Sequence, residues 1–175
     1  MGLKQFKLED YRFEILQQGQ AALIATASGT FDRVTQDADL QMVVQATVAQ
    51  LLAIAPPPGV DLTSGTVEFR TRVAGKNDQQ TITGQLALTE LTGGFGGTRL
   101  NRFGVALDFD AVVAGNMFEL RKASGAIRES ERVGGRIEAD GKLDLAPATP
   151  TGQIVVKLVD FNQDGKADLI TVDNN

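Results

Sequence analysis

The chain of 175 residues contains no cysteine, no histidine and no tryptophan, and Tyr11 is its single tyrosine. Without cysteine, it cannot form disulfides, thiolate zinc sites or a cysteine nucleophile. Without histidine, it lacks the commonest general base and the commonest transition-metal ligand, so Ser-His-Asp and Cys-His catalysis cannot be assembled. An enzyme would have to work with carboxylate, lysine, tyrosine or serine side chains alone. The composition therefore predicts a protein that is not an enzyme.

Clustered positive charge and long apolar runs are also missing. The net charge is −5 and the pI is about 4.8, with no basic block, so we expect no nucleic-acid partner. No apolar run approaches the roughly 20 residues of a membrane-spanning helix, and the first residues lack the apolar core of a signal peptide. Because a strand-like pattern begins almost at the first residue, we expect the sequence to be a segment of a longer chain.

What the chain has is alternation of apolar and polar residues, and the stretch around which the rest is organised lies between residues 59 and 88. After a connector at 59–65, apolar and polar residues alternate on both sides of a turn. Since side chains on a β-strand point alternately to its two faces, this stretch predicts a hairpin with one apolar face. Gly75, Asn77 and Asp78 supply the turn, because these residues tolerate positive φ or hydrogen-bond to their own backbone. The apolar positions are Val67, Phe69, Val73, Ile82, Leu86 and Leu88.

Similar patterns along the chain predict about nine strands, with turn signals roughly every 10 to 15 residues. They indicate an all-β fold: a mainly antiparallel sheet, curved or folded over, in one domain spanning residues 1–175. A change of apolar parity near Asp10 indicates a bulge. Gly29 is expected to end the second strand, and Asp140-Gly141 indicates either a hairpin turn or a bulge. The other strands are expected at residues 3–16, 21–28, 40–48, 103–110, 117–128, 133–145 and 154–161.

One short helix is expected at residues 48–54. Val48, Leu51 and Leu52 have the i, i+3, i+4 spacing of a helix face. The prolines at 56–58 then stop it, because proline lacks an N–H and pushes the preceding residue out of the α region. We expect this helix to cap one end of the sheet.

The cleanest alternation in the chain places Phe103, Val105, Leu107 and Phe109 on one face. The opposite face carries Asp108 and Asp110, which a glycosidase could use, although such a pair is more often the solvated face of a strand. The Gly-rich residues 92–97 match neither the G-x-G-x-x-G spacing nor the Walker-loop spacing of phosphate-binding sites. A flexible turn or bulge is therefore the preferred interpretation.

A calcium loop or a plain hairpin turn is indicated by the sequence DFNQDGKAD near the end of the chain. Oxygen side chains at positions 1, 3, 5 and 9, with glycine at 6, match a calcium loop, but Thr171 occupies position 12 in place of glutamate. The loop resembles those of FG-GAP and VCBS-type extracellular repeats, which implies a calcium-binding module for adhesion or scaffolding. Both interpretations stay open. The calcium ligands would be Asp160, Asn162, Asp164, the backbone carbonyl of Lys166, and Asp168.

Residues 3–158 resemble the AsmA/TamB-like family in the recurring pattern of their strand sequences, not in an invariant motif. The resemblance rests on ASGTFD, on the stretch DLQMVVQATVAQLLAIAPPPGVDLTSGTVEFRTRVAG, and on QTITGQLALTEL and GGRIEADGKLDL. The chain departs from that family in lacking its membrane anchor and in carrying the calcium-like loop, so residues 159–175 are set apart as a calcium-loop hairpin or tail.

The resemblance implies a long β-sheet with an apolar groove in the periplasm or cell envelope. It further implies a role in phospholipid transport and outer-membrane biogenesis, with membrane association through missing parts of a longer chain and no cofactor. The expected acyl-chain ligands would contact Val67, Phe69, Val73, Ile82, Leu86, Leu88, Phe103, Val105, Leu107 and Phe109. The same residues would form the core of a closed sandwich, and the sequence leaves that alternative open.

Overall fold

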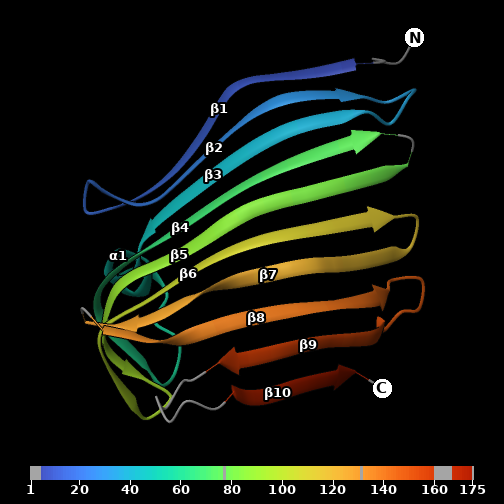
Figure 1. The fold of residues 1–175 in the computed structure, drawn as a ribbon. Coiled ribbons are helices and arrows are strands. Elements are labelled where there is room, and N and C mark those ends of the chain that lie inside the picture. Colours follow the sequence, from blue (N-terminus) through green and yellow to red (C-terminus); the bar gives the residue numbers. More distant parts are fainter. Residues whose placement is uncertain (1–4, 77, 131, 160–166, 175) are drawn as a thin grey trace.

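The computed structural model describes residues 5–76, 78–130, 132–159 and 167–174. They form a single ten-stranded antiparallel sheet in which every strand pairs with the next one along the chain (Figure 1). The strands are β1 (Gln5–Gln17), β2 (Gln20–Asp32), β3 (Ala38–Thr47), β4 (Val60–Lys76), β5 (Gln79–Phe95), β6 (Thr98–Ala114), β7 (Met117–Glu129), β8 (Arg132–Asp144), β9 (Thr151–Val159) and β10 (Ala167–Asn174).

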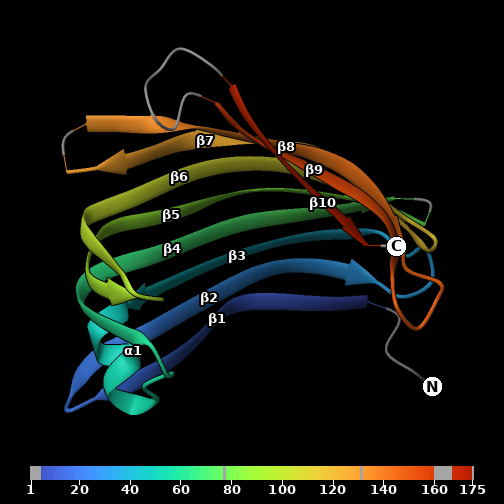
Figure 2. The ribbon, with the colours of Figure 1, turned by 90° about the horizontal axis from the view of Figure 1, so that it is seen from below.

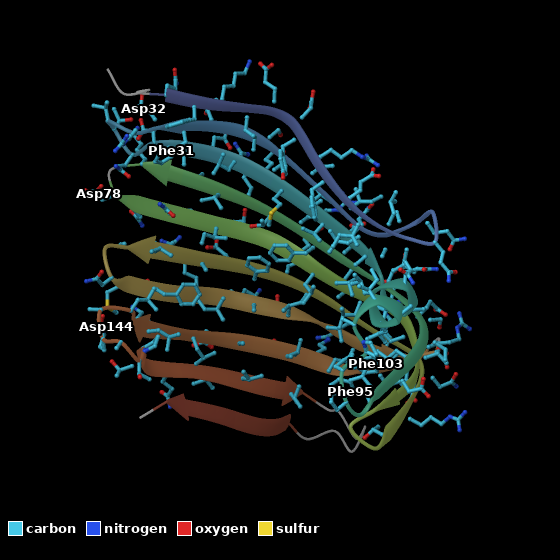
Figure 3. All side chains as sticks on the ribbon, turned by 180° about the vertical axis from the view of Figure 1, so that it is seen from behind. Phe31, Asp32, Asp78, Phe95, Phe103 and Asp144 are labelled. Atoms are coloured by element: carbon cyan, nitrogen blue, oxygen red, sulfur yellow. The ribbon has the colours of Figure 1, made fainter. Side chains whose placement is uncertain are left out.

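The all-β prediction is confirmed, and so is its one short helix, α1 (Val48–Ile54). The N–H of Ala55 donates to the carbonyl of Leu51 at 3.2 Å, and the prolines that follow end the helix there. Val48 is buried, and α1 packs chiefly against β4 and β2. The helix lies at one end of the sheet, at the back of Figure 1 and at the front of Figure 3.

Glycines expected to end a strand, to form a turn or to lie in a connector are found inside strands instead. β2 continues through Gly29, β4 begins at Val60 within the expected connector, and β8 runs through Gly141 without a turn. A β-carbon at Gly29 or Gly141 would collide with a carbonyl oxygen of the adjacent strand, that of Asp39 or Gln153 respectively. Glycine therefore permits close strand approach at these positions. Residues 132–144 form one long strand through Gly141, so the hairpin turn considered there is wrong.

Two other irregularities of the strands lie where the sequence predicts them. The pairing of β1 with β2 shifts between Leu8 and Tyr11, and Asp10 has a φ of 47°, so the predicted bulge is confirmed. The Gly-rich residues 92–97 combine a register shift in β5 with the turn into β6, as expected of a turn or bulge.

The sheet is curved and forms a single layer (Figure 2). Among the described strands, β1 and β10 are edges that do not pair with each other. The accessible surface is 11607 Å², against about 8,200 Å² for a typical globular monomer of this mass. No large side chain among the described residues is fully buried. The sheet is therefore open, and it does not fold into a closed sandwich.

Candidate functional site

One face of the sheet is apolar from strand to strand, and we call it the apolar face. Across β3 to β7 it consists of four cross-strand rows of five positions each. The rows are Ala46, Val67, Leu88, Val105 and Ile127; Val44, Phe69, Leu86, Leu107 and Gly125; Met42, Thr71, Gly84, Phe109 and Ala123; and Leu40, Val73, Ile82, Ala111 and Leu120.

The structure brings the ten residues predicted to contact acyl chains together on this face. Nine of them belong to the four rows, and Phe103 follows on the same face opposite Leu91. Phe103 lies at the end of the sheet near α1, while Phe31 lies toward the other end (Figure 3). All ten side chains are half-buried. Residues that are buried on the face include the small Ala46, Ala111 and Ala123.

β3 and β7 also belong to this surface, although their residues were not among the ten predicted from the sequence. Leu40, Met42 and Val44 extend the rows on one side, and Leu120 and Ile127 extend them on the other. The alternation in β3 was visible in the sequence, but strand alternation alone does not say which faces of two separate strands coincide. That information comes from the register between strands.

Thr71 is the single polar side chain in the four rows, and its hydroxyl is satisfied within the sheet. Its Oγ1 donates to the backbone carbonyl of Thr83 at 3.2 Å. Hydrogen-bonding the hydroxyl removes most of the cost of placing a threonine on an apolar surface. The rows therefore offer hydrocarbon contact without an unsatisfied polar group.

The opposite, polar face carries ion pairs and hydrogen bonds within and between strands. Arg72 donates from Nε and Nη2 to the two carboxylate oxygens of Asp39, both at 3.0 Å. The hydrogen bond from Arg72 lowers the pKa of Asp39 below its ordinary value. Glu68 accepts hydrogen bonds from Arg70 and, at 2.9 Å, from Gln45, and these lower its pKa in the same way.

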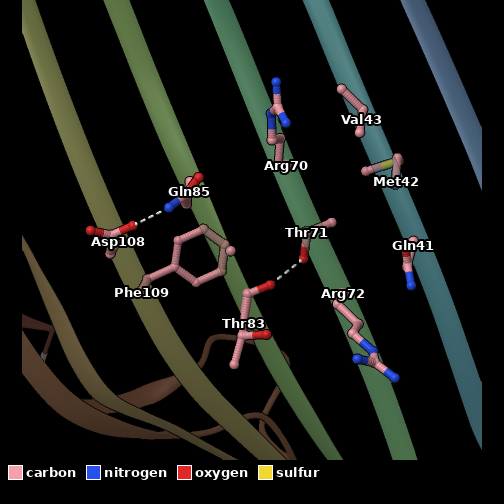
Figure 4. Close-up of a pocket in the computed structure, with 11 residues that line it drawn as sticks. Gln41, Met42, Val43, Arg70, Thr71, Arg72, Thr83, Gln85, Asp108 and Phe109 are labelled. Atoms are coloured by element: carbon pink, nitrogen blue, oxygen red, sulfur yellow. Dashed lines mark hydrogen bonds between the residues drawn. The ribbon is translucent and has the colours of Figure 1, made fainter.

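A depression of the described surface lies on this polar face. It has a volume of about 570 Å³ and spans β3 to β6 (Figure 4). Two cross-strand rows wall it, and the row between them turns its side chains to the apolar face. The wall residues are Val43, Arg70, Gln85 and Asp108 on one side and Gln41, Arg72 and Thr83 on the other. The apolar face is thus a continuous exposed surface, whereas this depression is a polar trough.

The two carboxylates considered for glycosidase chemistry share the polar face. Asp108 accepts a hydrogen bond from Gln85 Nε2 at 2.7 Å. Asp110 Oδ1 is buried without a hydrogen bond, and Arg121 Nη1 lies 4.0 Å from it. Both carboxylates lie along one strand beside polar neighbours, as expected for the polar side of a strand.

The predicted calcium ligands fall mainly outside the described residues. Asp160, Asn162, Asp164 and Lys166 belong to the segment that is not described, and Asp168 lies in β10, where it pairs with Leu158 of β9. Within the described ranges, no three acidic side chains gather into a metal-binding group. The calcium interpretation stays a prediction.

The described part of the chain contains no helix with the length and hydropathy needed to cross a bilayer. Comparison of the sequence with protein families and with curated proteins, and of the structure with solved structures, found no match. The resemblance to AsmA/TamB-like proteins therefore continues to rest on the quoted stretches of sequence.

Proposed function

We propose that this chain is a non-catalytic β-sheet segment whose apolar face holds the acyl chains of phospholipids. Its setting would be AsmA-like lipid transport in the cell envelope, serving outer-membrane biogenesis. The observation that carries the proposal is the continuity of the apolar face, where four rows across β3 to β7 contain a single polar side chain. The sequence resemblance supports the setting, and the structure supports the contact surface.

The dimensions of the face suit an acyl chain. Adjacent strands lie about 4.8 Å apart, so the four intervals from β3 to β7 span about 19 Å. One leaflet of a bilayer has about 15 Å of hydrocarbon, half of the full core. An acyl chain can therefore lie across these five strands and keep apolar side chains beneath it along its whole length.

The energetics favour hydrocarbon over water on this surface. Val67, Phe69 and Leu86 are half-buried and still present apolar area to water, so a ligand covering them removes apolar area of both partners from water. Each methylene buried in this way contributes about 0.8 kcal/mol. Binding of this kind is non-directional, which suits a surface along which a lipid has to move.

Native mass spectrometry of the purified chain, followed by organic extraction and lipid analysis, tests this function. We expect co-purified phospholipid, and we expect it to be lost in Met42→Gln and Phe69→Asp, two substitutions on the apolar face. Val43→Asp is the matched control, because Val43 is a half-buried apolar residue on the polar face. Circular dichroism establishes that each variant remains folded. Lipid that is absent from the parent chain, or retained equally in Met42→Gln and Val43→Asp, would contradict the proposal.

A calcium-binding module for adhesion or scaffolding is the second candidate, supported by the spacing of DFNQDGKAD. It predicts that calorimetric titration of the chain with Ca²⁺ gives saturable binding that Asp164→Ala abolishes. Asp78→Ala, in the turn between β4 and β5, is the control. A lipid-free chain that binds Ca²⁺ at this loop would favour the second candidate over the first.

A further inference from the structure

The first strand is the most exposed apolar element of the described chain. Five of its large apolar side chains have exposed fractions between 39% and 58%. They are Phe6, Leu8, Tyr11, Phe13 and Leu16. One side of β1 pairs with β2, and no other described strand pairs with its second side. An unpaired edge presents a row of backbone N–H and C=O groups that can pair with a further strand.

Charged positions of β1 alternate in sign along the strand when the neighbouring carboxylates Glu9 and Asp10 are counted as one position. The order is Lys7, Glu9, Arg12, Glu14, and the structure pairs Lys7 with Glu9 and Arg12 with Glu14 within the strand. All four groups are partly or largely exposed. Charges on an edge strand ordinarily discourage pairing with another chain, since like charges meet. An alternating order has the opposite effect when the partner is the same strand in the antiparallel direction.

The register of β1 makes it self-complementary about Tyr11. Glu9 and Asp10 form the bulge between Leu8 and Tyr11 and together occupy one position opposite β2. Around a two-fold axis through Tyr11, perpendicular to the sheet, each charge of one copy meets the opposite charge of the other. The opposed pairs are Lys7 with Glu14, the bulge carboxylates with Arg12, Leu8 with Phe13, and Phe6 with Ile15.

The same operation matches the faces of the two sheets. Leu8, Tyr11 and Phe13 pair with Gly29, Ala27 and Ala25 of β2, which lie on the apolar face. A two-fold axis perpendicular to the sheet keeps the apolar faces of both copies on the same side. Opposite charges and apolar pairs directly across antiparallel strands each stabilise the pairing.

We propose that β1 is an isologous dimerisation edge, at which two copies of the chain join antiparallel through their β1 strands with Tyr11 on the two-fold axis. The product is one sheet of twice the width with an uninterrupted apolar face. The partner is a second copy because the charge order and the apolar order of β1 both match their own reversal. The proposal does not depend on whether the face binds lipid.

Single cysteines test the register directly, since the chain contains no cysteine of its own. Directly opposed residues of antiparallel strands have Cα atoms about 4.5–5.5 Å apart, which is within the range that a disulfide spans. Tyr11→Cys is therefore expected to form a covalent dimer on mild oxidation. Leu8→Cys and Phe13→Cys are the controls. Each alone is expected to stay monomeric on a reducing-agent-free gel, because two copies of residue 8 would lie about 13 Å apart.

An equimolar mixture of Leu8→Cys and Phe13→Cys is expected to cross-link. Equal cross-linking of all three single variants would indicate random collision and overturn the register, as would a Tyr11→Cys chain that stays monomeric. Sedimentation velocity of the unmodified chain should show a concentration-dependent dimer. A ladder of larger species would instead indicate pairing of β1 with β10 of the next copy, and it would also overturn the proposal.

Charge reversal separates this pairing from general apolar association. Lys7→Glu places like charges opposite each other at both symmetry-related positions, and we expect the dimer dissociation constant to rise about tenfold. The double variant Lys7→Glu/Glu14→Lys restores both opposite-charge pairs, so its dissociation constant should return close to the parent value. A double variant as weak as the single one would contradict the proposed pairing.

Discussion

The ring of Phe109 on β6 lies parallel to the ring of Phe69 on β4, with 5.9 Å between centroids and 9° between planes. Gly84 on the intervening strand makes this contact possible, since a β-carbon there would lie 2.5 Å from Cζ of Phe109. The aromatic ring covers the glycine, as edge and bulge glycines are covered in other sheets. A glycine and two phenylalanines thus form one packing unit in the middle of the apolar face.

Gly84→Ala is expected to destabilise the sheet. The new methyl group would collide with Phe109 and with the carbonyl oxygen of Arg70, so the ring has to move off the strand. Overpacking of this kind costs about 1–3 kcal/mol of unfolding free energy, measurable by urea denaturation. Gly94→Ala is the control, because its nearest neighbour would be Asp61 Cβ at 3.9 Å and its φ is not in the left-handed region. Equal destabilisation of both variants would contradict the packing argument.

The stacked rings should be energetically coupled. Phe69→Leu and Phe109→Leu each remove one ring while keeping an apolar side chain on the face. For offset or stacked aromatic pairs, we expect a coupling energy of about 0.5–1.5 kcal/mol from the double-mutant cycle. The measurement is the unfolding free energy of both single variants and the double variant. Additive single effects would mean that the two rings lie side by side without stabilising each other.

Much of this arrangement could be predicted from local sequence patterns, and the failures share one physical cause. The strand at 103–110 and the helix at 48–54 could be predicted, because the residue patterns that indicate them lie within one strand or one helix. The continuation of β2 through Gly29 could not be predicted from the sequence. Glycine is needed there because a β-carbon would collide with the carbonyl oxygen of Asp39 on β3, a neighbour that local sequence does not reveal. Residues 159–175 were left open as a hairpin or a tail for the same reason, because the strand character of β10 depends on its pairing with β9.

For the candidate surface too, local patterns predicted part of the arrangement, and the rest depended on contacts between strands. Each of the ten predicted residues could be assigned to a face of its own strand, and the structure places all ten on one face of the sheet. Its extension to β3 and β7 required the register between strands. The polar trough walled by Arg70 and Arg72 was unpredictable, because its shape comes from side chains of four strands.

Acid should weaken the polar face through Asp39. The hydrogen bond from Arg72 lowers the pKa of Asp39 in the folded state below its ordinary value near 3.8. A carboxyl group with a lowered folded-state pKa stabilises the fold fully above its unfolded pKa and loses that contribution as pH falls through the folded value. Asp39→Asn should therefore lower stability modestly at pH 7 and make stability less dependent on pH below about 4.

The denaturation midpoint at pH 7 and pH 3 measures this effect. Because both side chains are exposed, we expect it to shrink in 1 M salt. Arg72→Gln should reproduce the loss of stability at pH 7. The double variant Asp39→Asn/Arg72→Gln should have a denaturation midpoint no lower than that of either single variant. A double variant that loses the sum of both single effects would indicate that the two residues act separately.

Ile127 should contribute more to stability than any exposed apolar residue of similar size. Its side chain on β7 is 8% exposed, in the row with Val105, whereas Ile54 at the end of α1 is 46% exposed. Ile127→Ala removes buried methyl groups and leaves space that a single-layer sheet can only partly close, so we expect a loss of about 2–4 kcal/mol. Ile54→Ala should cost under about 1 kcal/mol, because less of that side chain leaves water on folding. Urea denaturation of both variants measures the difference. Similar losses would mean that burial on the apolar face adds little to the free energy of unfolding. The hydrogen bonds between strands would then supply most of the stability of the sheet.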